Sequence, residues 1–324
     1  MKTLVEAEKL KAYYNIGLNR FVRAVDHVSL SIKEEEMVGI AGESGCGKST
    51  LLKVLIASVN PPLTMLEGKV LYNIDGGKID ILSLDENRLR DLRWKVFTVI
   101  PQNAMNSLNP VSKIRKIFLE TINAHQKIED REQAEKLIED IFEKTGLSKK
   151  FLGFYPVQLS GGMKQRVVIA LATILKPKMI FCDEPTSGLD LVTQKNILQL
   201  LRELQKELKN TLVLVSHDMG IQAQATDRII IMYAGKIVES APTKKIFEEP
   251  YHPYTNALIN SLPVIGDKSC KIGLHGTPPS LINPPKGCRF SRRCPFSTDA
   301  CENEEVPLVE VEPDHHVACL RFGV

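Results

Sequence analysis

The chain has 324 residues, of which 43% are hydrophobic and 25% charged, and its formal net charge is +3. These values are typical of a globular protein with two domains, or with one large domain and an appendage. So small a charge gives no reason to expect a nucleic-acid partner. The first eleven residues carry scattered charges without an apolar core, and the apolar stretch at 167–175 is too short to span a membrane. We therefore expect a cytosolic protein that can still bind an integral membrane partner.

The first forty residues are expected to form β-structure. Apolar and polar residues alternate from Ala24 to Ile32, as they do in a half-buried strand. Upstream of this strand, Tyr13 and Tyr14 precede a short loop. An aromatic ring at such a place can stack on a nucleotide base, although either ring can equally be an ordinary surface or core tyrosine.

A phosphate-binding motif, G-x-x-x-x-G-K-[ST], begins at Gly42, after a buried strand at 37–41. In such a loop, glycines let several backbone N–H groups converge on a phosphate chain, and the helix that follows directs its positive end at the same anion. Lys48 can reach the β- and γ-phosphates, and the Ser49 hydroxyl can bind Mg²⁺. The motif therefore predicts a nucleoside triphosphate site, with a chance glycine-rich turn as the alternative.

Strands are expected next at 68–74 and 96–100, and the second of them is followed by Gln102, whose side chain can point into a site. From 103 to 158 the pattern changes to helices and loops. Asp130 has the character of a helix N-cap, and an apolar stripe follows it at 137–142. We interpret this region as a helical insertion into an α/β core.

The sequence Leu159-Ser160-Gly161-Gly162 opens a helix that is expected to run to about Lys176, and its N-terminus can bind a second anion. A strand at 178–182 then ends in Asp183 and Glu184. Asp183 can bind Mg²⁺, and Glu184 can serve as the general base for an attacking water.

The next strand, at 211–216, ends at His217. A lone histidine is more often structural than functional. Gln102, Asp183 and His217 nevertheless all follow strand ends, which is where open α/β sheets bind their ligands.

These segments, in this order, resemble the nucleotide-binding subunits of ATP-binding cassette (ABC) transporters. The L-S-G-G signature at 159–162 distinguishes that family from other P-loop ATPases. The resemblance covers residues 1–240 and implies a P-loop ABC ATPase core, with RecA-like α/β and antiparallel β parts. A helical subdomain would lie at about 103–176, and a small loop-rich extension would occupy 241–324.

The resemblance also implies hydrolysis of ATP with Mg²⁺ in a head-to-tail dimer of two cassettes. Glu184 would be the catalytic carboxylate, His217 the switch histidine, and Asp190 part of a loop that crosses the dimer interface. Gln102 would serve Mg²⁺ and its waters, together with Ser49 and Asp183. Tyr14 best fits the position that stacks on the base, with Tyr13 as the alternative. The remaining contacts to ATP would come from Gly42, Ser44, Gly45, Cys46, Gly47, Lys48, Ser49 and Thr50, and across the dimer from Ser160, Gly161 and Gly162.

Residues 246–255, 276–281 and 287–295 resemble the C-terminal extension of oligopeptide/dipeptide importer ATPases. In those proteins the extension can carry four cysteines, which here are Cys288, Cys294, Cys301 and Cys319. Four thiolates suit a [4Fe–4S] cluster or zinc. The lack of a Cys-x₂-Cys knuckle and the dipeptide-type resemblance favour the [4Fe–4S] cluster, with zinc and uncoordinated thiols as alternatives. Arg289, Arg292 and Arg293 would offset the cluster's charge, or else form a solvated basic turn.

The favoured function is that of the ATPase subunit of a di- or oligopeptide importer, bound peripherally to the cytoplasmic side of the cell membrane. Its partners would be a second ABC ATPase subunit, identical or not, two transmembrane permease subunits and an extracytoplasmic substrate-binding protein. The alternative is a soluble ABC ATPase with an iron–sulfur cluster that acts in translation or DNA repair. Such proteins usually have two cassettes or a long coiled coil, whereas this chain has one phosphate loop and no heptad run. The sequence does not distinguish peptides from nickel chelates or oligosaccharides as the substrate.

Overall fold

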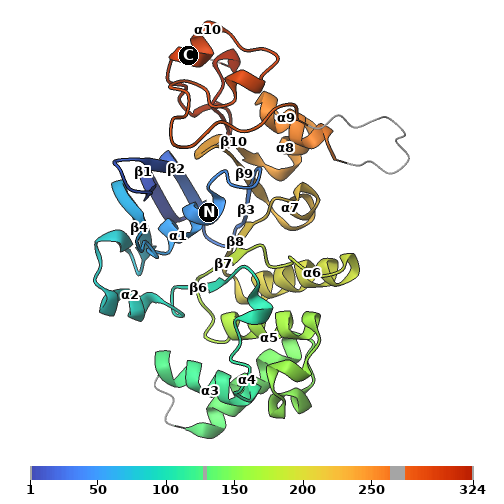
Figure 1. Cartoon of the computed structure of the whole chain (residues 1–324). Coiled ribbons are helices and arrows are strands. Elements are labelled where there is room, and N and C mark those ends of the chain that lie inside the picture. The colour runs from blue at the N-terminus through green and yellow to red at the C-terminus, as the bar shows by residue number, and fades with distance from the viewer. Residues whose placement is uncertain (1, 127–129, 263–273, 323–324) are drawn as a thin grey trace. The chain divides into compact units, whose positions relative to one another are not determined.

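The computed structural model describes residues 2–126, 130–262 and 274–322 (Figure 1). The chain divides into two compact units. The phosphate-loop unit comprises residues 2–33, 38–83 and the chain from 215 onward, and the signature unit comprises residues 34–37 and 84–214.

The phosphate-loop unit contains an antiparallel sheet with the strand order β2-β1-β4-β5. Its strands are β1 (Thr3–Asn15), β2 (Phe21–Lys33), β4 (Leu63–Ile74) and β5 (Gly77–Asp80). The alternation at 24–32 does lie in a strand, β2, whose Val28 and Ile32 are buried. The strand expected at 68–74 begins earlier, at Leu63.

A second sheet of this unit has the order β11-β12-β10-β9-β3. β3 (Met37–Ala41) runs parallel to β9 (Arg228–Tyr233), and β9 is antiparallel to β10 (Lys236–Pro242). The C-terminal region then adds β12 (His315–Val317) and β11 (Val309–Glu312), both antiparallel to their neighbours. Sequence reasoning did not predict these last two strands. The region after residue 240 therefore extends a core sheet rather than consisting of loops alone.

Helices and short 3₁₀ turns complete the phosphate-loop unit. They are α1 (Lys48–Leu55), η1 (Ile81–Ser83), α7 (Met219–Ala225), α8 (Thr243–Glu248), α9 (Pro253–Asn260), η5 (Ser291–Arg293), α10 (Asp299–Asn303) and η6 (Leu320–Phe322).

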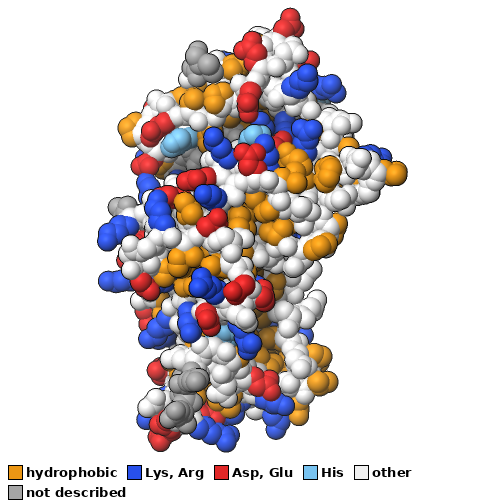
Figure 2. Space-filling model, turned by 90° about the vertical axis from the view of Figure 1, so that its left-hand side faces the viewer, with side chains coloured by type: hydrophobic (Ala, Val, Ile, Leu, Met, Phe, Trp, Pro, Cys, Tyr) orange, Lys and Arg blue, Asp and Glu red, His pale blue; other side chains and the backbone are white. Residues whose placement is uncertain are grey.

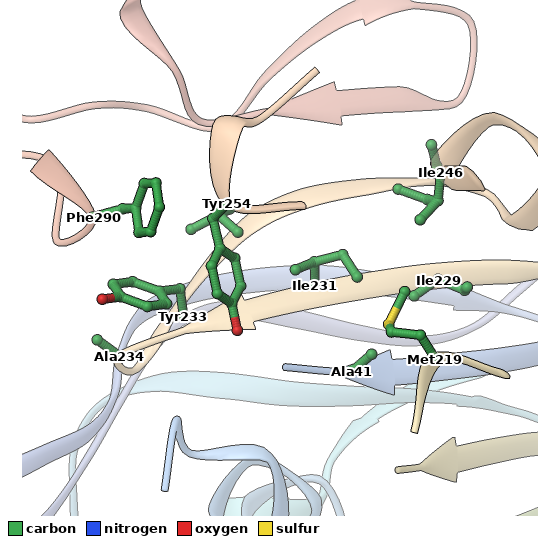
Figure 3. Packing of buried hydrophobic residues seen from close by; sticks show 11 residues of the cluster. Ala41, Met219, Ile229, Ile231, Tyr233, Ala234, Ile246, Tyr254 and Phe290 are labelled. Carbon is green, nitrogen blue, oxygen red and sulfur yellow. The ribbon is translucent and has the colours of Figure 1, made fainter. Parts of the chain in front are cut away.

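A hydrophobic cluster joins the core sheet to the extension. Tyr233 at the end of β9 packs against Tyr254 of α9 and Phe290 of the extension, with ring centroids 4.5 and 5.3 Å away (Figure 3). The extension is thus packed on the sheet that leads into the phosphate loop.

Among the described residues of the signature unit, the strands follow the order β8-β7-β6, namely β8 (Thr211–Val215), β7 (Met179–Asp183) and β6 (Phe97–Ile100). Its helices and turns are α2 (Glu86–Leu92), η2 (Ala104–Asn106), α3 (Ile114–His125), α4 (Arg131–Lys144), η3 (Lys149–Gly153), η4 (Pro156–Gln158), α5 (Gly161–Thr173) and α6 (Leu191–Leu208). Asp130 caps α4 as expected, accepting a hydrogen bond from the Glu132 N–H at 2.8 Å. The helix that begins at the signature ends at Thr173, before the predicted Lys176, and the Thr173 hydroxyl donates to the Ile169 carbonyl.

Among the described residues, no helix combines the length and apolar character that a membrane span requires. Figure 2 shows basic and acidic side chains interspersed over the face that it presents.

Candidate nucleotide site and cysteine cavity

The phosphate loop connects β3 to α1 and needs glycine at two close contacts. Gly47, the N-cap of α1, has φ +106°, and a Cβ atom there would lie 2.0 Å from the Ala24 carbonyl oxygen. Gly42 has φ +146°, and its Cβ would lie 2.2 Å from the Met232 carbonyl oxygen. Such positive φ angles are favourable only for glycine, and the close contacts are with backbone atoms, which cannot move aside easily. The loop is therefore held between β2 and β9.

Lys48 is buried within this loop. Its ammonium donates to the carbonyl oxygens of Gly42 at 2.7 Å and Glu43 at 3.0 Å. Ser44 and Gly45, in contrast, are exposed at the tip of the loop. The cation and the exposed loop backbone are what an anionic ligand requires at a helix N-terminus.

The other predicted residues of the phosphate-loop unit lie around this loop. The Tyr14 hydroxyl is 3.2 Å from the Thr50 hydroxyl, whereas the Tyr13 hydroxyl donates to Asp26 at 2.5 Å. Tyr14 is thus the tyrosine beside the start of α1, on which Ser49 also lies. Cys46 is buried, and burial raises the pKa of its thiol, so it remains a neutral packing group.

His217 follows β8 and is exposed. Its position is fixed by the neighbours on either side. The Ser216 N–H donates to the Ile40 carbonyl oxygen of β3 at 3.2 Å, and the Asp218 carboxylate caps α7. The His217 loop is therefore anchored to the strand that enters the phosphate loop.

In the signature unit, the structure brings Gln102, Asp183 and Glu184 to one edge of the sheet. β6 and β7 are parallel, and Ile100 pairs with Cys182, so Gln102 and the two carboxylates follow adjacent strand ends. Glu184 has φ +48°, a conformation that a non-glycine residue adopts at a cost of about 1 kcal/mol or more. Strain of this kind is typical of functional positions.

The signature and Asp190 also lie together. Ser160 caps α5, its hydroxyl accepting from the Met163 N–H at 3.4 Å. A Cβ on Gly162 would lie 3.0 Å from the Thr193 methyl, and Asp190 caps α6 by accepting from the Thr193 N–H and hydroxyl at 3.0 and 2.6 Å. The Thr193 hydroxyl bond also lowers the pKa of Asp190. The glycine-rich N-terminus of α5 thus lies beside the ionised carboxylate of Asp190.

The four C-terminal cysteines line one small cavity with about 20 Å³ of space, together with His252, Ser291 and Arg321. All four are free thiols, and burial, with the other three cysteines adding to it, raises the pKa of Cys288 to about 11. Within residues 2–126, 130–262 and 274–322, no three His, Cys, Asp or Glu side chains are arranged to hold a metal ion. The predicted [4Fe–4S] cluster is therefore not confirmed. Cys270 lies outside the described residues.

Of the three arginines expected to offset the cluster's charge, Arg292 is exposed and the other two pair with carboxylates instead. Arg289 pairs with the buried Asp26, and Arg293 pairs with Glu43. Burial by itself would raise the pKa of Asp26, but the Tyr13 hydroxyl and Arg289 outweigh it and hold that pKa low. Arg321, which sequence reasoning missed, is the arginine that lines the cysteine cavity.

A phosphate loop with buried lysine and a separate L-S-G-G helix start together define a P-loop ATPase of the ABC class. The ABC transporter family matches residues 25–187, and the family described as the oligopeptide/dipeptide transporter C-terminal region matches residues 238–301. The chain belongs to the ABC transporter family, as an ATPase subunit that carries this C-terminal region.

Two curated relatives extend the match to the whole chain. The dipeptide transport ATP-binding protein DppD of Caldanaerobacter subterraneus subsp. tengcongensis is 41% identical, over 98% of this chain and 97% of that protein. The oligopeptide transport ATP-binding protein AppF of Bacillus subtilis is 38% identical, over 99% and 98%. Neither relative's name refers to translation or DNA repair, so the comparisons do not support the soluble alternative.

Solved structures give the same fold. The ATP-binding cassette MJ0796, solved as a dimer in a post-hydrolysis state with ADP and Pi, is 31% identical with a TM-score of 0.64 over 74% of this chain and 99% of that chain. The cbiO1 protein of Clostridium perfringens, part of the ABC transporter complex cbiONQ, is 28% identical with a TM-score of 0.63 over 77% and 92%.

Proposed function

We propose that this chain is the ATPase subunit of an importer of di- or oligopeptides. The observation that carries the proposal is the match along the whole chain to peptide-transport ATPases, which includes the C-terminal region as well as the cassette. Specificity for the cargo would lie in other subunits, so peptides are proposed from the relatives' names and not from a pocket in this chain.

For hydrolysis, we propose that the Lys48 ammonium and the loop N–H groups bind the phosphates, and that Tyr14 stacks on the base. Ser49, Gln102 and Asp183 would hold Mg²⁺, which lowers the negative charge on the phosphates. Glu184 would accept the proton of the attacking water, and His217 would contact the γ-phosphate. Each cassette has both the carboxylate and the signature, so it would give a competent half to each of two composite sites.

We further propose that two cassettes dimerise head to tail around ATP. Ser160, Gly161 and Gly162 would then bind the partner's γ-phosphate, with Asp190 at the interface. Leu191 and Val192, directly after Asp190, are 82% and 71% exposed, which suits a surface covered by a second cassette. The partner can be an identical chain or a different ATPase subunit.

Two permease subunits would anchor the dimer to the cytoplasmic side of the cell membrane, and an extracytoplasmic binding protein would deliver the cargo. The segment 103–125 would dock on the permeases. Val111 in that segment is 80% exposed, as expected of a residue that packs on a partner. In this division, residues 1–240 form the nucleotide-binding domain, 103–176 its helical subdomain and 241–324 the extension.

The test is to tag the chain in its native host, solubilise membranes gently under anaerobic conditions, and identify what co-purifies. Two multi-span subunits and a cassette partner would support the importer, and the ligand of the associated binding protein would identify the cargo. Recovery only in the soluble fraction, with ribosomes or DNA, would overturn it.

For the cysteine cavity, we propose a [4Fe–4S] cluster held by Cys288, Cys294, Cys301 and Cys319. Two buried polar atoms support a polar occupant. His252 and Ser291 line the cavity, and the His252 Nε2 and the Ser291 Oγ are buried without a hydrogen-bond partner among the described residues. Because the His252 Nδ1 accepts from the Tyr254 N–H at 3.0 Å, the ring hydrogen is on Nε2. Both atoms can therefore donate to sulfur, and Arg321 supplies positive charge.

When bound, the cluster would have a structural role, cross-linking the loops of the extension through its four cysteine ligands. Iron and acid-labile sulfide analysis of anaerobically purified protein tests the proposal. Four of each per chain, lost in a Cys294→Ser variant, are expected. One zinc per chain, or no metal, would overturn the proposal.

A further inference from the structure

An ion pair connects the C-terminal extension to the phosphate loop. The Arg293 guanidinium donates from Nη1 to Glu43 Oε2 at 2.9 Å and from Nη2 to Glu43 Oε1 at 3.0 Å. The Arg293 side chain is only 5% exposed and that of Glu43 24%. A two-pronged pair of this kind is stronger and more directional than a single neutral hydrogen bond. It joins the second residue of the loop to a residue 250 positions later.

Arg293 is itself fixed in place, so the pair is not a flexible surface contact. Its Nε donates to the His275 carbonyl oxygen at 2.9 Å, and Nη1 also donates to the Tyr233 hydroxyl at 3.1 Å. The guanidinium lies over the rings of Tyr233 and Phe290, 5.7 and 5.8 Å from their centroids. Figure 3 shows these two rings close together beside Tyr254, and they meet edge to face, with an interplanar angle of 89°. The cation is therefore held by groups that do not belong to the loop.

The same loop residue has two further contacts, and one leads to the phosphate-binding lysine. The Glu43 N–H donates to the Tyr254 hydroxyl at 2.8 Å, and its carbonyl oxygen accepts from the Lys48 ammonium at 3.0 Å. Pro278, Pro279 and Leu281 of the extension line a small cavity with loop residues 43–46. The extension thus contacts the outer side of the loop at several points.

Because Glu43 is charged, its ion pair with Arg293 affects ligand binding as well as the stability of the loop. A carboxylate in a loop that binds the phosphates of ATP repels the ligand unless a cation neutralises it. Lys48 bonds to the Glu43 backbone, and the Glu43 carboxylate bonds to Arg293.

We propose that Arg293 is a positioning residue for ATP binding, which neutralises Glu43 and holds the phosphate loop in its binding conformation. The inference rests on the proposed role of the phosphate loop in binding ATP. It gives the extension a part in nucleotide binding, in addition to any part in holding a cofactor.

The experiment measures the Kd for ATP and the thermal midpoint of the full chain in five variants. Arg293→Met should raise Kd about tenfold, and KM with it, while kcat stays within about twofold, because the loss is of ground-state binding. Arg293→Lys should fall between Arg293→Met and the unchanged protein, since it keeps the charge but not the second bond. Arg292→Met is the control: Arg292 is exposed beside Arg293, and its Kd should not change.

The double variant Glu43→Gln/Arg293→Met distinguishes an effect through the charge of Glu43 from a purely structural attachment of the loop to the extension. If Arg293 acts through the Glu43 charge, removing that charge restores part of the affinity, and the Kd falls below that of Arg293→Met. A double variant that binds ATP as weakly as Arg293→Met or more weakly, or an Arg293→Met variant with unchanged Kd, would overturn the inference. Lys48→Ala shows which idea has failed. If it too binds ATP normally, the proposed nucleotide site is wrong; if it alone loses binding, only the role of Arg293 is wrong.

Discussion

Gly45 and Gly47 form a matched pair that tests why the phosphate loop keeps its shape. Both have positive φ, +78° at Gly45 and +106° at Gly47. A Cβ on Gly45 would meet no described atom within 4 Å, whereas one on Gly47 would lie 2.0 Å from the Ala24 carbonyl oxygen of β2. Alanine at the first position therefore adds only conformational strain. Alanine at the second also forces apart two backbone segments.

The two costs can be estimated. A non-glycine residue in the left-handed region costs about 1–2 kcal/mol. Gly47→Ala adds a clash with backbone, of about 1–3 kcal/mol, which brings the expected loss to roughly 3 kcal/mol or more. At about 3 °C per kcal/mol for a unit of this size, we expect the thermal midpoint to fall by about 4 °C in Gly45→Ala and about 10 °C in Gly47→Ala.

Calorimetry without nucleotide is the appropriate assay, because a Cβ on Gly45 points into open space that a phosphate would use. The comparison between the two variants matters more than either value, since the strain is common to both. Equal losses of stability, or a larger loss in Gly45→Ala, would refute the argument that the loop is held by its approach to β2.

Three further predictions follow from the same contacts. Glu184→Gln should bind ATP but lose turnover by at least about 100-fold and accumulate as a closed dimer by size-exclusion chromatography; hydrolysis at the normal rate would show that Glu184 is not the base. Glu239→Gln should lower the free energy of unfolding by about 2–4 kcal/mol, because this fully buried carboxylate accepts from the N–H groups of Tyr251 and His252 and pairs with His315. Glu248→Gln, at an exposed position, is the control. Identical denaturation curves for the Glu239→Gln and Glu248→Gln variants would contradict this reasoning. If the cavity holds a [4Fe–4S] cluster, His252→Leu should lower its reduction potential by about 60 mV, because the reduced, more negative cluster loses a hydrogen-bond donor; an unchanged potential in a titration followed by electron paramagnetic resonance would show that Nε2 does not reach the sulfur.

Sequence reasoning worked where a feature depends on neighbouring residues. The strand expected to begin at Thr211, the cap at Asp130 and the loop between β3 and α1 all follow from local pattern, and each is present. The choice between Tyr13 and Tyr14 could not be made in that way, because the two are adjacent. Only the fold shows that one hydroxyl is occupied by Asp26 and the other lies beside Thr50.

Pairings between residues far apart in the chain could not be predicted from the sequence, either for short strands or for charged side chains. The segment Val309–Glu312 is too short to be predicted as a strand from its own residues, and it forms β11 by pairing with β12, which in turn pairs with β10. Arginines next to cysteines suggest a charge balance for the cysteines, yet Arg293 reaches Glu43 and leaves Arg321 to line the cavity. Both arrangements arise because the extension folds back on the core sheet. The same short turn thus presents Cys294 to the cavity and Arg293 to Glu43 of the phosphate loop.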